Sequence, residues 1–445
     1  MWTRACRFLG SALCCFTLAA GGPPAAIDPG TANRYFHEAQ VLSQREGGRL
    51  WGVPLYGPML FVDEGSRAVI ANGPDAQGVL RQQGEVWEGR LPAVVGASNT
   101  AMDWSGTHWT MVLWPLPGDR HGREKLLMHE CFHRVQSHLD LQVQDRPCGH
   151  LDTKEGRIWL QLEWRALGEA LVSRGTAQHR AIQDALRFRA YRRSLFPEAA
   201  EAERDLELNE GLAEYTGLRA SARSRAQAIA DALVDLNHFA QMPTFVRSFA
   251  YASGPAYGLL LDATAPGWRT RLHGRPDLGE LLRKAEGIKV LPTSKEQALG
   301  RAVQYGWAEL AQDETRRDDE HHSRVTAYEA RLVDGPVLIL PRTGDFNYAF
   351  NPNQLLPLGD RGMVYPTLRA TGSWGILEAT EGALMTKGDL RIPAPEAPQS
   401  RPLKGAGWSL DLASGWGLAP GPRKGDFHLV LNPVTAASPA PRDVP

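Results

Sequence analysis

Two histidines and a glutamate near residue 130 have the types and the spacing that metal chemistry requires. Residues 126–138 read LLMHECFHRVQSH and contain a His-Glu-X-X-His motif. On an α-helix, His129 and His133 would share one face, where both imidazoles can bind a single metal ion. Glu130 would lie beside the metal, where a base can take a proton from water. The alternative is an amphipathic helix with two surface histidines.

A pair of glutamates at helical spacing lies further along the chain. Glu210 and Glu214 belong to the segment NEGLAEY, and their spacing places both on one face of a helix. Two carboxylates on one face repel each other unless a cation or a donor is nearby. A zinc ion and its histidines would relieve this repulsion, since one carboxylate can bind the metal and the other can accept a histidine N–H.

The two motifs together resemble the gluzincin metallopeptidases, the thermolysin-like and aminopeptidase-N-like group. The resemblance covers residues 95–265 and rests on HExxH followed by NExxA and an acidic residue. It implies a zincin-like catalytic core with one Zn²⁺ ion. It also implies that Glu210 is the third zinc ligand and that Glu214 orients a ligand histidine.

The distance between the motifs departs from the best-known members of that group. Here 77 positions separate His133 from Glu210, several times the usual separation. We expect the helical stretch at 157–195 to fill this gap, because an insertion between helices is tolerated when its ends stay close.

Three further residues are similar in placement to substrate-binding residues of aminopeptidase-like gluzincins. In that group a tyrosine near a glycine, after the third-ligand helix, hydrogen-bonds the transition-state oxyanion. Tyr251 matches this placement and Tyr257 is the second candidate, although a packed core tyrosine explains either one equally well. Asp103, in the segment NTAMDW, could meet a substrate amine, and a turn before the next strand is the simpler explanation.

Length and charge limit the classes of function. A chain of 445 residues exceeds one ordinary core, so we expect two or three domains. The net charge of −1 argues against nucleic-acid and anionic-membrane partners. After the N-terminal segment, no stretch approaches the ~18 continuous apolar residues of a membrane helix, so no stable membrane span is expected.

The N-terminus has the features of an export signal. Two arginines precede the apolar run 8–20, and small residues follow it. We therefore expect a signal peptide at 1–26 and export to the periplasm or the exterior of the cell. Cys14 and Cys15 lie in this segment, but neither follows a small residue, so plain export is preferred to a lipoprotein anchor.

Cys131 and Cys148 are the two cysteines that would remain after cleavage. An even pair in an exported protein could form a disulfide, which would tie the motif helix to the loop that follows it. The alternative is a buried free Cys131.

Hydrophobic patterning divides the mature chain into three parts. Residues 27–118 carry short alternating runs between Gly, Pro, Asn and Asp, which predict a β-rich part. Residues 119–312 carry apolar residues at three- and four-residue spacing, which predicts a helical core. Residues 325–433 again alternate, which predicts an all-β sandwich or barrel. The predicted fold class is α+β.

Three short stretches complete this division. The charged run 313–324 is predicted to be a linker. Residues 434–445 have the composition of a disordered tail. The strand expected at 107–114 is either a core strand or an edge to which an extended peptide could add.

The sequence therefore predicts an exported zinc-dependent peptidase that acts on peptides or proteins. Whether it would be an endopeptidase or an aminopeptidase stays open. The alternative is a non-catalytic zincin-fold protein that serves as a binding module or scaffold. Glu130 favours the enzyme, because a structural zinc site needs no base and is usually closed by a fourth ligand.

Overall fold

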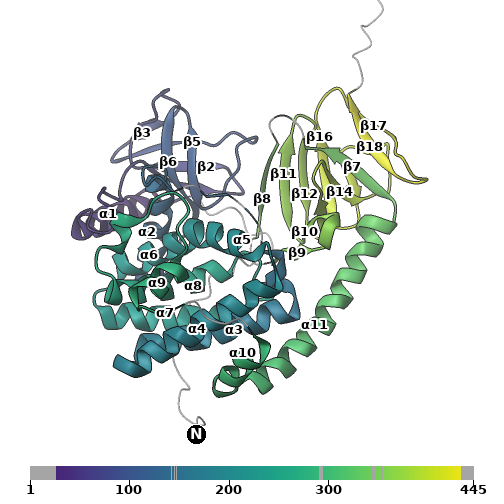
Figure 1. The fold of residues 1–445 in the computed structure, drawn as a ribbon. Coiled ribbons are helices and arrows are strands. Elements are labelled where there is room, and N and C mark those ends of the chain that lie inside the picture. Colours follow the sequence, from purple (N-terminus) through teal and green to yellow (C-terminus); the bar gives the residue numbers. More distant parts are fainter. Residues whose placement is uncertain are drawn as a thin grey trace, which may run out of the picture. The chain divides into compact units, whose positions relative to one another are not determined.

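The computed structural model describes residues 27–431, except 142, 145, 147, 290–293, 343, 345, 352 and 353. The predicted signal peptide 1–26 and the predicted tail 434–445 lie outside the described residues. Helices and strands both contribute, with sheets in the N- and C-terminal parts and helices between them, so the α+β class is confirmed (Figure 1).

The chain forms two compact units. Unit 1 contains the chain up to Cys148, Trp159–Gln241 and Ser248–Trp307. Unit 2 contains Gly149–Ile158, Met242–Arg247 and the chain from Ala308 onward. The β-rich part and the helical part that the sequence separated at residue 118 therefore belong to one unit.

Unit 1 begins with a helix that the sequence pattern did not predict. Within the expected β-rich part 27–118, α1 runs over Pro29–Glu46. Asp28 caps its first turn by accepting a hydrogen bond from the backbone N–H of Thr31, and Gly47 ends it with φ of 65°. Its buried residues recur at helical spacing and include Ala32, Phe36, Ala39 and Leu42.

A six-stranded sheet follows α1, in the order β3-β4-β2-β1-β6-β5. Its strands are β1 (Met59–Asp63), β2 (Ala68–Ala71), β3 (Arg81–Gln83), β4 (Val86–Arg90), β5 (Thr100–Trp104) and β6 (Thr107–Trp114). Strand β6 pairs in parallel with β1 and antiparallel with β5. It is therefore a core strand, one of the two possibilities for 107–114, and β5 forms the edge.

The helical part of unit 1 is built on α2, which carries the HExxH motif. Its helices are α2 (Arg120–Gln136), α3 (Lys154–Val172), α4 (Gly175–Leu195), α5 (Ala199–Leu206), the π-helix η2 (Glu207–Gly211), α6 (Leu212–Ser221), α7 (Arg225–Phe239), α8 (Phe249–Thr264), η3 (Trp268–Arg271), α9 (Leu278–Ala285), α10 (Lys295–Ala302) and η4 (Val303–Tyr305). Helix α2 packs against α6, β5 and β6.

Glycines allow these helices to approach closely. A Cβ atom added at Gly217 of α6 would stand 2.5 Å from the backbone oxygen of Lys125 in α2. Gly254 of α8 lies against Gly211, and Gly258 lies against the ring of Tyr215. The backbones of α2 and α6 therefore come close at Gly217, and those of α8 and η2 (Glu207–Gly211) at Gly254, while Gly258 leaves room for the ring of Tyr215.

Unit 2 contains a β-sandwich. Strands β17-β18-β7-β14-β13-β10-β9 form one sheet and β15-β16-β12-β11-β8 the other. Their bounds are β7 (Val337–Pro341), β8 (Asn347–Phe350), β9 (Leu356–Pro357), β10 (Met363–Tyr365), β11 (Leu368–Gly372), β12 (Gly375–Ala379), β13 (Ala383–Met385), β14 (Asp389–Pro393), β15 (Leu403–Gly405), β16 (Trp408–Leu412), β17 (Trp416–Pro420) and β18 (Phe427–Leu431). Residues of both sheets, such as Leu340 and Leu377, share one core, so the two sheets pack face to face, which is one of the two arrangements expected for residues 325–433.

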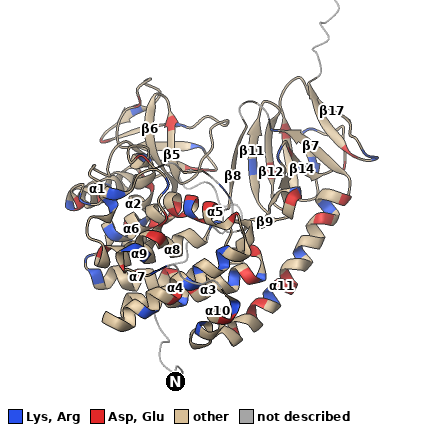
Figure 2. Ribbon diagram, viewed as in Figure 1, with Lys and Arg blue, Asp and Glu red and all other residues tan. Residues whose placement is uncertain are grey.

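The charged run 313–324 is not a linker. It lies inside α11 (Trp307–Glu329), along which acidic and basic residues alternate, and the π-helix η5 (Ala330–Asp334) follows (Figure 2). Arg316 pairs with Asp313 one turn away, and buried Glu314 pairs with Arg157 at 2.6 Å. Charges at helical spacing thus stabilise a helix that composition alone could not distinguish from a linker.

No helix in the described part of the chain is both long enough and apolar enough to cross a membrane.

Candidate metal centre

Helix α2 presents the two motif histidines. Asp119 caps its first turn by accepting a hydrogen bond from the N–H of Gly122 at 2.6 Å. Ten of its residues are buried, and His129 is among them with 4% of its surface exposed. The motif therefore lies on a helix, as predicted, and that helix (Arg120–Gln136) is buried on the face of His129, which excludes two surface histidines on an exposed helix.

A π-helix presents the third acidic residue. Glu210 lies in η2, where the backbone makes one wide turn before α6 begins. Glu207 in the same turn accepts hydrogen bonds from Arg189 at 2.5 and 2.8 Å, and both side chains are buried. Such turns are frequent at functional sites. The sequence predicted a continuous helix here, because the motif carries no signal for a wider turn.

Three potential ligand atoms converge between α2 and η2. The Nε2 atoms of His129 and His133 are 3.2 Å apart. The Oε2 atom of Glu210 lies 3.6 Å from the first nitrogen and 3.5 Å from the second. Ligand atoms placed tetrahedrally around Zn²⁺ at their usual distances stand ~3.3 Å apart, so this triangle fits one zinc ion.

No other group of His, Cys, Asp or Glu within the described ranges converges in this way. The sequence prediction of His129, His133 and Glu210 as one cluster is thus matched by the geometry. The cluster itself does not identify the metal.

Glu214 hydrogen-bonds His129 at the ring nitrogen that faces away from the cluster. Its Oε2 atom lies 2.7 Å from Nδ1 of His129, on the ring edge opposite the ligand atom. The Nδ1–H group of His129 then donates to the carboxylate of Glu214, and Nε2 keeps the free lone pair that can bind a metal. The predicted position of Glu214 behind a ligand histidine agrees with this contact.

A buried lysine and aspartate, which the sequence reading missed, complete this arrangement. The Nζ atom of Lys125 lies 2.6 Å from Glu214 and 2.8 Å from Asp235. Burial raises the pKa of Glu214, but Lys125 and His129 outweigh it and lower that pKa to about 2. Lys125 stands four residues before His129 on the same helix face, and that spacing was the available signal.

The second histidine is oriented from its own helix. Nδ1 of His133 lies 3.3 Å from Oε1 of Gln136, and Nε2 of Gln136 donates to the backbone oxygen of Leu208 in η2. Gln136 therefore links the ligand helix α2 to the segment that carries Glu210. The sequence reading did not single out this glutamine.

Glu130 has an unsatisfied carboxylate beside the three ligand atoms. Its Oε1 atom lies 3.9 Å from Nε2 of His129. Its Oε2 atom is buried and accepts no hydrogen bond from any described residue, which is a costly state for a carboxylate. Burial raises the pKa of Glu130 above its ordinary value. A buried acceptor without a donor, next to a possible metal site, is positioned to receive a proton from water.

No protein-family model, curated protein or solved structure matches this chain. The assignment of function therefore depends on the geometry of the centre.

Tyr251 lies directly on the cluster. Its hydroxyl donates a hydrogen bond to Oε2 of Glu210 at 2.7 Å. Its ring stacks on His129, with centroids 5.6 Å apart, and on Phe239, with centroids 5.7 Å apart. The sequence-predicted candidate thus contacts two of the three potential ligands, and its predicted role toward an oxyanion stays a prediction.

Tyr257, the second tyrosine candidate, lies in the core. It is fully buried, and its hydroxyl donates to Glu163 at 2.6 Å. Arg189 lies over its ring at 5.1 Å. Its predicted substrate-binding role is therefore wrong, because its ring and hydroxyl are both enclosed by a buried network of charged side chains.

Asp103 lies on the edge strand β5 and is exposed. Its side chain is 86% exposed and pairs with His108 across the β5–β6 hairpin at 2.8 Å. It belongs to a strand and not to a turn before one. Its contacts do not test the predicted role toward a substrate amine.

The predicted disulfide is absent. Cys131 and Cys148 are both buried, and no disulfide joins them. The side chain of Cys131 is fully buried. Cys131 stands between the two histidines in sequence, so its side chain points away from their face of the helix. On this helix the opposite direction leads into the protein core.

Proposed function

We propose that this protein is a zinc-dependent peptidase with a zincin-like core. His129, His133 and Glu210 would hold one zinc ion, and Glu214 would orient the first histidine. The observation that carries the proposal is the ligand triangle together with the unpartnered buried carboxylate of Glu130. Three protein ligands leave a position for water or substrate, which a catalytic zinc site requires.

Each residue of the centre would have a separate role in peptide-bond hydrolysis. A zinc ion held there would polarise the scissile carbonyl and lower the pKa of water. Glu130 would take a proton from the attacking water and deliver it to the leaving amine. Tyr251 donates its one hydroxyl proton to Glu210, and it would turn this donor toward the oxyanion when substrate binds.

The edge strand β5 would align the substrate. It pairs with β6 on one side only, and α2 packs against it. The free edge of a strand offers backbone N–H and C=O groups to an extended peptide. Asp103, exposed on this strand, would then meet an amine or a basic side chain of the substrate.

Hydrolysis of a peptide library by the purified mature protein tests the proposal. We expect cleavage that a chelator abolishes and that added Zn²⁺ restores. The positions of the cuts would separate an aminopeptidase from an endopeptidase. One bound zinc ion with no cleavage would favour the alternative, a non-catalytic binding or scaffold protein. No bound zinc would contradict the site itself.

A further inference from the structure

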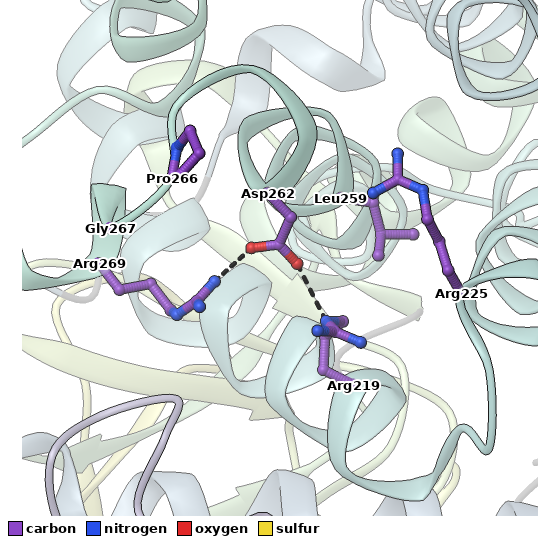
Figure 3. Close-up of a pocket in the computed structure, with 7 residues that line it drawn as sticks. All are labelled: Arg219, Arg225, Leu259, Asp262, Pro266, Gly267 and Arg269. Carbon is purple, nitrogen blue, oxygen red and sulfur yellow. Dashed lines mark hydrogen bonds and ion pairs between the residues drawn. The ribbon is translucent and has the colours of Figure 1, made fainter.

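A cavity in unit 1, separate from the candidate metal centre, is lined by three arginines. It encloses about 290 Å³ between the end of α6, the start of α7 and the segment after α8 (Figure 3). None of the residues of the metal centre lines it. Along α8, Asp262 of this cavity lies roughly 16 Å beyond Tyr251, because a helix rises about 1.5 Å per residue.

An aspartate fixes two of the arginines. Asp262 accepts a hydrogen bond from Nε of Arg219 at 2.9 Å and pairs with Arg269 on its other side. Tyr215 and Trp268 donate to the same carboxylate at 2.8 and 3.0 Å. Figure 3 shows Asp262 between the two guanidinium groups. With four donors, the carboxylate is satisfied and holds both arginines in place before any ligand arrives.

Donors at this cavity remain unused. In Arg269, Nε donates to the backbone oxygen of Leu50, and Nη1 donates to Tyr215 and Asp262. Its Nη2 has no hydrogen-bond partner among the described residues. Arg225 begins α7 and is exposed, and no described residue forms an ion pair or hydrogen bond with its side chain. Three guanidinium groups against one carboxylate leave an excess of two positive charges in a concave site.

We propose that this cavity binds a phosphate group, either free phosphate or a phosphate monoester. A dianion balances the two excess charges, and the planar fork of arginine matches the oxygens of a tetrahedral oxyanion. The volume lies at the lower end of the range for ligand pockets, which suits a small ligand. A flat, singly charged carboxylate would leave one positive charge unbalanced.

Arg225 is the residue to vary, because it adds charge without supporting the fold. Its side chain is exposed and makes no hydrogen bond or ion pair with a described residue that Arg225→Gln would break, so the variant should fold. Arg223→Gln is the matched control, since Arg223 is exposed two residues earlier and does not line the cavity. Both variants lose one positive charge from the same surface.

Titration calorimetry with the zinc-loaded mature protein tests the proposal, at constant ionic strength. We expect inorganic phosphate or glycerol 3-phosphate to bind saturably with one site, and the tighter of the two identifies the source of the phosphate group. One charge-assisted hydrogen bond is worth roughly tenfold or more in affinity, so Arg225→Gln should weaken binding by about that factor. Arg223→Gln should change it by less than about twofold, as a peripheral charge does.

Three results would overturn the proposal. The first is binding that does not saturate. The second is an equal effect of the two variants, or none from Arg225→Gln, which would place the phosphate on the metal or on the general surface. The third is malonate binding as tightly as phosphate, which would assign the cavity to carboxylates. As an independent readout, phosphate should raise the melting temperature of the wild type more than that of Arg225→Gln.

Discussion

At the scale of single residues, the proposed metal centre is supported by charged side chains behind His129. Lys125 lies between Glu214 and Asp235, and Glu214 contacts His129. The lysine compensates the two carboxylates, so that one of them can stay ionised and hold the histidine. A ligand histidine that is held in one tautomer loses less freedom when a metal binds.

We expect Glu214→Gln to weaken zinc binding. The amide keeps the shape of the side chain but removes the charge that fixes the Nδ1 proton of His129 and pairs with Lys125. Loss of such a partner typically costs 10- to 100-fold in metal affinity. Competition with a chromophoric chelator measures the change. Glu201→Gln, at an exposed carboxylate of α5, is the control. Equal zinc affinity in the two variants would show that Glu214 does not contribute to metal binding.

At the scale of elements, the centre requires α2 and α6 to lie unusually close. Gly217 faces the backbone of α2 beside Lys125 and His129. The close approach brings Glu214 within reach of the histidine ring. The π-helix η2 then places Glu210 on the same side as Nε2 of both histidines.

Gly217→Ala should separate these two helices. The new methyl group would stand 2.5 Å from the oxygen of Lys125 and 3.3 Å from Cβ of His129. We expect a loss of about 1–3 kcal/mol of stability, as for other overpacked contacts, and weaker zinc binding. Gly168→Ala in α3 is the control, because its nearest neighbours lie at 3.5 and 3.7 Å. Thermal unfolding compares the two variants. Equal melting temperatures would show that α6 can move away from α2 at no cost in stability.

The loop before β3 offers a prediction about pH. Asp75 accepts hydrogen bonds from Ser105 and from the backbone N–H groups of Val79 and Leu80. Burial raises the pKa of Asp75, but these donors outweigh it and lower the pKa to about 2. Because the folded state prefers the ionised form, this stabilisation is complete above the unfolded pKa near 3.8 and is lost as the pH falls toward 2.

Asp75→Asn should therefore destabilise unit 1 at neutral pH by about 1 kcal/mol and make little difference near pH 2. Urea unfolding at several pH values measures both effects. Glu64→Gln, at an exposed position in the same sheet region, is the control. A difference between Asp75→Asn and wild type that stays constant down to pH 2 would contradict this account.

At the scale of the whole molecule, the two units should respond differently to metal. All three potential ligands belong to unit 1, and unit 2 has a separate sandwich core. A bound ion stabilises the folded state by mass action, by about 4 kcal/mol when its free concentration is 1,000 times its dissociation constant. Scanning calorimetry should show two transitions, of which a chelator lowers one. A chelator that shifts both transitions equally, or neither, would contradict this expectation.

Sequence reasoning found the residues of the centre better than it found the elements around them. Helical spacing places His129 and His133 on one face and Glu210 and Glu214 on another. The His-Glu-X-X-His motif indicated Glu130, and the resemblance to gluzincins implied the separate roles of Glu210 and Glu214. Residue spacing could not reveal Lys125 opposite Asp235, since 110 positions separate them.

The misses have physical causes. The helix α1 was missed because a weakly apolar amphipathic segment preceded clear strand signals. The linker at 313–324 proved helical because the charges that suggested solvent exposure also pair along the helix. Tyr257 was kept as a second candidate beside a packed core tyrosine, because burial cannot be deduced from one tyrosine in the sequence. Export remains a prediction, because its signal segment lies outside the described residues.

The most direct test of the central claim compares peptide hydrolysis by the wild type and by Glu130→Gln, both carrying one zinc ion per chain. Glu130 does not belong to the three residues that could hold the metal, so Glu130→Gln should keep its zinc. We predict that the wild type cleaves peptides and that the zinc-loaded variant loses at least about a hundredfold in rate, as expected for a missing general base. Equal rates in the two proteins would contradict the account, since Glu130 would then have no part in the reaction.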